Sequence, residues 1–280
     1  MKLFGNTVLL LLLLTTACCT TQRNTESRSI TVSIPPLQYI VREIVGNDFD
    51  IEIIVPAGAS PETYEPTPAQ MMELERSRIV MALGLMDFER TLMEKLSERA
   101  EICDLSRGVK LLAGTCNHGH RHGTDPHIWM SPKQLRLIAR NAYEAIAAAF
   151  PDSVRYADNY WRLDTSIARL DSLVAAHVAA SPHRSFITFH PVYTYYAADY
   201  GLTQIALESE GKEPSAARIK EVVEAARRDS LHTIVCQSHL STASVETVAS
   251  ELGIGTVTTD PLSSDLPAEI IRITDIVTRR

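Results

Sequence analysis

The chain has 280 residues, of which 45% are hydrophobic and 22% are charged, and its formal net charge at pH 7 is -7. This composition excludes disordered and fibrous proteins, and the length allows two domains of about 100–150 residues each. The negative charge disfavours nucleic acid as a partner, because duplex binding depends on Lys and Arg side chains that neutralise phosphates.

The N-terminus has the pattern of an export signal. Lys2 precedes an apolar stretch from Val8 to Leu14. That stretch is too short to remain as a membrane-spanning helix, which needs about 20 residues, so residues 1–17 are predicted to be a cleaved signal peptide.

Small residues lead from this stretch to Cys18, and the pattern resembles a bacterial lipobox, in which the cysteine is lipidated and becomes the first residue of the mature chain. Thr15 stands where a lipobox usually has Leu or Val, so an ordinary secreted protein is the alternative. Residues 18–29 are predicted to form a flexible, lipidated tether. Of the remaining cysteines, Cys103, Cys116 and Cys236, at most one pair can form a disulfide.

Strand-like and helix-like segments alternate in residues 30–150. The expected elements are a strand at 30–34, a helix at 37–45, a strand at 51–55, a helix from Pro68, a strand at 79–83 and a helix from Pro132. Alternation of this kind predicts a mainly parallel sheet covered by helices. Thr67-Pro68 and Ser131-Pro132 each offer a hydroxyl at the N-cap and a proline at the first helical position.

A long helix is expected in residues 151–181. Apolar residues recur at helical spacing from Tyr160 to Val178 until Ser181-Pro182 ends the run. Strands and helices then alternate again in residues 182–280. The predicted fold class is therefore α/β, with two Rossmann-like lobes of mainly parallel sheets joined by one long spine helix.

Four strand-like segments lead into side chains that bind metals. The side chains are Glu62, His127, His190 and Asp260, and Ile128 beside His127 is expected to belong to such a strand. Ligands of open α/β sheets bind beyond the carboxyl ends of strands, so these groups are predicted to meet around one divalent cation. Alternatively, each histidine is a hydrogen-bonded structural residue and Asp260 is a turn residue or cap.

Several motifs resemble the zinc- and manganese-binding lipoproteins that supply bacterial ABC importers. They are Gly58-Ala-Ser-Pro-Glu-Thr-Tyr-Glu-Pro-Thr-Pro68, Asp125-Pro-His-Ile-Trp-Met-Ser-Pro132, Phe189-His190, Tyr196-Ala-Ala-Asp-Tyr-Gly-Leu202, Glu213-Pro-Ser215 and Asp260-Pro-Leu262. The resemblance covers nearly the whole exported chain. It implies a two-lobed receptor that holds a divalent metal between its lobes.

The resemblance also implies a ligand set, with one departure. His127 and His190 match family histidines and Asp260 matches the family carboxylate, but Glu62 stands where the family normally has histidine. A glutamate ligand would make the site harder and more anionic, which moves its preference toward manganese or iron without excluding zinc. In the alternative, Glu62 points away and solvent completes the coordination shell.

A histidine-rich loop precedes the second motif. His118, His120 and His122 alternate with glycine and arginine, and zinc receptors of the resembled family often carry a longer loop of this kind here. These histidines are predicted to be auxiliary zinc ligands, so Zn²⁺ is favoured over Mn²⁺ as the cargo. The alternative is a polar surface loop without a role in metal binding.

A metal receptor is thus the predicted function. The implied partners are an ABC permease and ATPase complex and a membrane reached through the lipid anchor, and the receptor is expected to be a monomer facing the periplasm or cell exterior. The first alternative is a metal-dependent hydrolase in which Glu62 or Glu65 acts as general base. The second is an adhesin on the same scaffold. The chain has no His-Glu-x-x-His and no Gly-x-Ser-x-Gly motif, which favours the receptor.

Overall fold

The computed structural model of the chain describes residues 29–96, 101–114, 123–151, 154–208, 213–237 and 243–279. The predicted signal peptide, Cys18 and almost all of the predicted tether lie outside these ranges. Ser29, the last residue assigned to the tether, is already part of the first strand.

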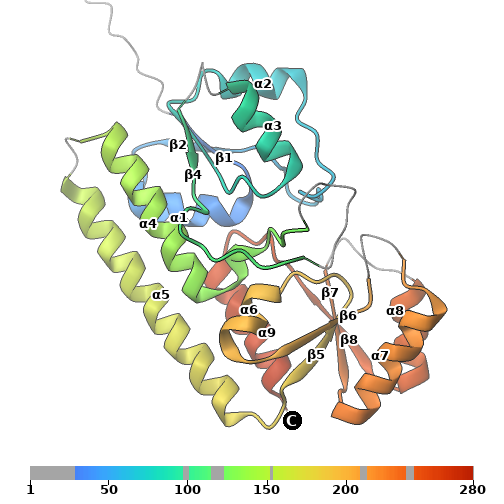
Figure 1. Cartoon of the computed structure of the whole chain (residues 1–280). Helices are drawn as coiled ribbons and strands as arrows, with labels where there is room; N and C mark the ends of the chain where they lie inside the picture. The colour runs from blue at the N-terminus through green and yellow to red at the C-terminus, as the bar shows by residue number, and fades with distance from the viewer. Residues whose placement is uncertain are drawn as a thin grey trace, which may run out of the picture.

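The N-terminal lobe is built around a four-stranded parallel sheet (Figure 1). Its elements are β1 (Ser29–Val32), α1 (Pro35–Val45), β2 (Asp50–Ile53), α2 (Pro68–Leu74), β3 (Ile79–Ala82), α3 (Asp87–Leu96) and β4 (Ile102–Asp104). The strand order is β2-β1-β3-β4, and each neighbouring pair is parallel. The helix α3 and the three-residue edge strand β4 were not predicted from the sequence.

The start of α2 follows the sequence rule for a helix N-terminus. Thr67 accepts a hydrogen bond from the backbone N–H of Gln70, whose side chain accepts one from the Thr67 backbone, and Pro68 occupies the first turn. This reciprocal capping fixes where the loop after β2 ends.

The segment around Ile128 is not a strand, and that prediction was wrong. Residues Ile128–Met130 form the short 3-10 helix η1, in which Ile128 donates to the Pro126 carbonyl at 2.8 Å. The segment lies between Pro126 and Pro132, which have no N–H to give to a sheet. It leads directly into α4 (Pro132–Ala149).

The spine helix is α5 (Val154–Ala180), with 27 residues and therefore about 40 Å long. Its buried residues are Tyr156, Tyr160, Leu163, Ile167, Leu170, Val174 and Val178. The helix runs along one side of both lobes and packs against α1 and α4 of the first lobe and α9 (Leu266–Thr278) of the second (Figure 1).

The C-terminal lobe repeats the arrangement of the first. Its remaining elements are β5 (Ser185–Thr188), α6 (Thr194–Tyr200), β6 (Thr203–Ala206), α7 (Ala216–Asp229), β7 (Thr233–Gln237), α8 (Ala243–Leu252) and β8 (Gly255–Thr259). The sheet order is β6-β5-β7-β8, again all parallel. The predicted fold class, two parallel α/β lobes with a long connecting helix, is confirmed.

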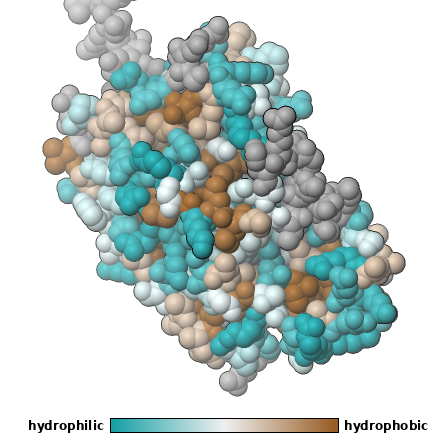
Figure 2. All heavy atoms as spheres, in the orientation of Figure 1, coloured by the Kyte–Doolittle hydropathy of each residue, from teal (hydrophilic) through white to brown (hydrophobic). Residues whose placement is uncertain are grey.

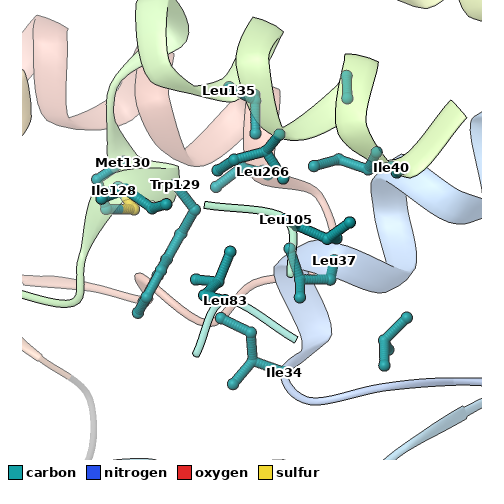
Figure 3. Close-up of a cluster of buried hydrophobic side chains, with 14 of the residues drawn as sticks. Ile34, Leu37, Ile40, Leu83, Leu105, Ile128, Trp129, Met130, Leu135 and Leu266 are labelled. Atoms are coloured by element: carbon teal, nitrogen blue, oxygen red, sulfur yellow. The ribbon is translucent and has the colours of Figure 1, made fainter. Parts of the chain in front are cut away.

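A hydrophobic core cluster extends across both lobes, and a second, smaller cluster lies within the C-terminal lobe. Figure 3 shows Trp129 and Leu83 of the first lobe in the same cluster as Leu266, the first residue of α9. All three side chains are at most 1% exposed. The lobes are therefore joined by packed apolar side chains as well as by the spine helix.

The surface mixes polar and apolar residues. On the face shown in Figure 2, brown patches are separated by teal and pale residues. None of the helices in the described ranges is long and apolar enough to cross a membrane.

The shared core predicts cooperative unfolding. Leu266→Ala should lower the free energy of unfolding by about 2–5 kcal/mol, because it leaves a cavity at a fully buried position. Ile271→Ala, on the same helix but 36% exposed, should cost about 1 kcal/mol or less. Urea unfolding followed by circular dichroism and by tryptophan fluorescence should give one coincident transition, and two separate transitions would contradict the shared core.

Candidate metal centre

Three of the four predicted ligands lie together between the lobes. Glu62 comes from the loop after β2, His127 immediately precedes η1, and His190 follows β5. Among the described residues, these three form a group in which one potential ligand atom of each lies within 4.8 Å of the others. The histidines are 3% and 4% exposed.

The spacing of the donor atoms suits a small divalent cation. The distance from Glu62 Oε1 is 2.8 Å to His190 Nε2 and 3.4 Å to His127 Nε2. Two ligands about 2.0–2.2 Å from one zinc ion at tetrahedral angles lie about 3.3–3.6 Å apart. Small side-chain adjustments would therefore convert this cluster into a coordination shell.

Asp125 orients His127. Its carboxylate oxygen Oδ1 accepts the backbone N–H of His127 at 2.8 Å and lies 2.9 Å from ring atom Nδ1. Both residues are buried. A proton on Nδ1 is thus held by Asp125, which directs Nε2 toward Glu62, as carboxylates do for histidine ligands in metal sites.

Glu208 has the same relation to His190. It follows β6, the neighbour of β5, and its Oε2 lies 2.9 Å from His190 Nδ1. Both ring nitrogens of His190 therefore face carboxylate oxygens, Glu208 on one side and Glu62 on the other. The ring can donate to both only as an imidazolium ion.

The carboxylates dominate the protonation of both histidines. Burial lowers the pKa of His190, but hydrogen bonds to Glu208 and Glu62 outweigh burial and raise this pKa to about 10. Burial likewise opposes protonation of His127, yet the charge and hydrogen bond of Asp125, together with Glu62, raise its pKa above the usual value. A metal must displace protons from these nitrogens.

An aromatic wall closes one side of the site. The ring of Trp129 lies 5.2 Å from that of His127, centroid to centroid, and is 1% exposed. Its Nε1 donates to the carbonyl of Pro261 at 2.8 Å, which ties the wall to the segment after β8 in the other lobe.

Asp260, the fourth predicted ligand, is not part of the group. It is exposed, its Oδ1 accepts the Leu262 N–H at 3.1 Å, and its own N–H donates to Glu269 at 2.9 Å. This is the turn geometry that was the alternative in the sequence analysis. Metal ligation by Asp260 stays a prediction that requires its carboxylate to leave this turn.

The remaining predicted groups are placed as follows. His118, His120 and His122 of the auxiliary loop, with Cys116, lie outside the described residues. Glu65 is exposed in the Glu62 loop. Cys103 and Cys236 are free thiols, and burial raises the pKa of Cys103 to about 11.

Sequence reasoning missed the orienting role of Asp125 and Glu208. Asp125 was within the quoted motif, and a carboxylate two residues before a histidine is a usable signal. Glu208 lies 18 residues from His190, and only the pairing of β5 with β6 brings the two together.

Comparisons with known proteins identify a matching family and several relatives. The family model described as "ZnuA: Zinc-uptake complex component A periplasmic" matches residues 30–273. The zinc-binding lipoprotein AdcA of Streptococcus pneumoniae is 26% identical over 251 residues, and the match covers 84% of this chain and 50% of AdcA. The chain thus spans about half the length of the AdcA proteins.

Two solved structures are similar at 32% identity. A crystal structure of ZnuA has a TM-score of 0.83, and the match covers 89% of this chain and 97% of the ZnuA chain. A ZnuA deletion mutant with zinc bound has a TM-score of 0.81, and the match covers 90% of this chain and 98% of the mutant chain.

The raised pKa of His190 predicts how the stability of the metal-free protein depends on pH. A pKa that rises from 6.5 to about 10 on folding stabilises the fold fully below pH 6.5 and loses this contribution as pH increases toward 10. In chelator, the melting temperature of the native protein should therefore approach that of His190→Gln between pH 6.5 and 10. A difference in melting temperature between the native protein and His190→Gln that does not change over this pH range would contradict the assignment.

Proposed function

Because the chain belongs to the family of zinc-uptake periplasmic component A proteins, we propose that it is an extracytoplasmic receptor that captures a divalent transition metal and delivers it to an ABC importer. The ligands in this proposal are Glu62, His127 and His190, with Asp260 as a fourth ligand after rearrangement. Zinc is the favoured cargo and manganese the alternative.

One observation carries the proposal: two buried imidazoles from different lobes point their Nε2 atoms at the same carboxylate oxygen. Isolated structural histidines have no reason to converge in this way. Carboxylates behind both rings fix the ring orientations that a metal ligand needs. The cluster lies beyond the carboxyl ends of β2 and β5, where α/β folds bind ligands.

The donor set favours zinc. Two imidazoles and one carboxylate match the nitrogen and oxygen ligands of zinc, whereas manganese prefers more oxygen ligands. The zinc-binding relatives AdcA and ZnuA support the same choice. Glu62 adds a hard ligand, so this site should discriminate against manganese less strongly than a three-histidine site.

The hydrolase alternative is weaker than the receptor. Its proposed base, Glu62, lies 2.8 Å from one histidine and 3.4 Å from the other, inside the ligand group itself. The matched family is a solute-binding component rather than an enzyme. We therefore propose a receptor and not an enzyme.

The partners and location follow from the same proposal. The receptor acts as a monomer that docks to an ABC permease and ATPase complex, and Cys18 anchors it to a bacterial membrane, facing the periplasm or cell exterior. AdcA is a zinc-binding lipoprotein, which supports the anchor. We propose the boundaries 1–17 for the signal peptide, 18–29 for the tether, 30–150 and 182–280 for the lobes, and 151–181 for the spine.

Metal titration tests the assigned ligands. Metal-free protein should bind one zinc ion tightly at pH 7.5, and His127→Ala combined with His190→Ala should abolish this binding. Affinity should fall as pH is lowered, because protons compete for both rings. Binding at the native affinity in the double variant would rule out the site, and His183→Ala with His232→Ala provides a control with the same loss of two imidazoles.

The variant Glu62→His tests how the glutamate at position 62, where the family normally has histidine, affects the preference between zinc and manganese. Replacing the carboxylate with imidazole should weaken manganese binding at least about tenfold while zinc affinity stays within a few-fold, because manganese prefers oxygen ligands. The control is Glu65→His, an exposed position in the same loop, which should change neither affinity. Competition titrations with both metals measure the ratio, and an unchanged ratio in Glu62→His would show that Glu62 is not a ligand.

A further inference from the structure

A short antiparallel ladder lies immediately before the metal centre. Its arms are the backbone around Leu112 and the backbone around Asp125, joined by the bridge between Ala113 and Thr124. The Asp125 N–H donates to the Leu112 carbonyl at 3.0 Å. In an ordinary antiparallel pair, the Leu112 N–H would donate to the Asp125 carbonyl in return.

Here the hydroxyl of Tyr195 lies between the Leu112 N–H and the Asp125 carbonyl and bonds to both. It accepts a hydrogen bond from the Leu112 N–H at 3.1 Å and donates one to the Asp125 carbonyl at 2.9 Å. A direct N–H to carbonyl bond would span only about 2.9 Å. The hydroxyl therefore acts as a spacer that keeps the two arms apart at this point.

Tyr195 belongs to α6, in the lobe opposite the ladder. Its side chain is 1% exposed, and burial raises the pKa of its hydroxyl to about 12. The hydroxyl thus keeps its proton at neutral pH and remains a donor to Asp125.

The position of Asp125 matters because its carboxylate holds His127 at both the backbone N–H and ring atom Nδ1. Gly114 also packs closely against this backbone, since a Cβ at Gly114 would lie 3.1 Å from the Asp125 nitrogen. The Asp125 backbone is therefore confined between the first lobe and the Tyr195 hydroxyl.

We propose that Tyr195 is a positioning residue for metal capture, whose hydroxyl fixes Asp125 and thereby sets the direction of the His127 imidazole. The inference rests on the proposed function of the site. His190 is already in the same lobe as Tyr195, so the hydroxyl aligns the first-lobe histidine with the second-lobe histidine. Without the hydroxyl, Leu112 and Asp125 close toward a direct bond and turn the carboxylate away from Nδ1.

The test compares two phenylalanine variants on one helix. Tyr195→Phe removes the spacer, whereas Tyr196→Phe removes an equally buried hydroxyl that bonds to Thr274 at 2.9 Å, away from the site. Zinc affinity is measured by competition with a chromophoric chelator. Tyr195→Phe should bind zinc about tenfold more weakly, and Tyr196→Phe should stay within twofold of the native protein.

A spectroscopic readout separates positioning from general stability. Both variants should lower the melting temperature of the metal-free protein, but only Tyr195→Phe should alter the visible absorption spectrum of the cobalt-loaded protein, which reports ligand geometry. Equal loss of affinity in both variants, or a native cobalt spectrum in Tyr195→Phe, would overturn the inference.

A double-mutant cycle tests the route through Asp125. In an Asp125→Ala background, adding Tyr195→Phe should cause no further loss of zinc affinity, and additive losses would overturn the inference. Tight binding by the native protein with unchanged affinity in Tyr195→Phe would refute this inference alone. Failure of the native protein to bind zinc would refute the proposed function and this inference with it.

Discussion

Paired burial of opposite charges is the constraint on which the centre depends. Two histidines and three carboxylates, Glu62, Asp125 and Glu208, occupy a volume from which solvent is largely excluded. An unpaired ion at such a position would be costly, so each imidazole needs a carboxylate at hydrogen-bond distance. These contacts also hold the Nε2 atoms of both rings close to the same oxygen of Glu62.

Contacts between the two lobes keep the Nε2 atoms of His127 and His190 in place. A common apolar core and several polar contacts join the lobes, including Trp129 to Pro261 and the Ser131 hydroxyl to Asp199. Ser131 is the N-cap residue of α4, but its hydroxyl is used for this contact and not for capping. Large hinge motion would break these contacts together, so the metal capture proposed above requires rearrangement of side chains and not a rotation of one lobe against the other.

Local signals predicted most of the fold. Apolar runs ending in polar residues marked the strands, and the cap at Thr67 marked a helix start. The short elements β4 and η1 have no clear hydrophobic periodicity. The first was missed and the second was misassigned, because contacts with neighbouring segments determine their conformation. The site was predictable in its ligand types, but Glu208 and the turn at Asp260 depend on contacts between distant segments.

The charge balance of the proposed metal binding is the same with a glutamate or a histidine at position 62. With both rings protonated, three carboxylates and two imidazolium ions leave one net negative charge. A divalent cation that displaces both ring protons leaves the same net charge. Exchange of two protons for one metal ion therefore adds no uncompensated charge to a buried region, where such a charge is costly. With a neutral imidazole at position 62, the same exchange would leave no net charge, so Glu62 makes the site more attractive to cations without altering this balance.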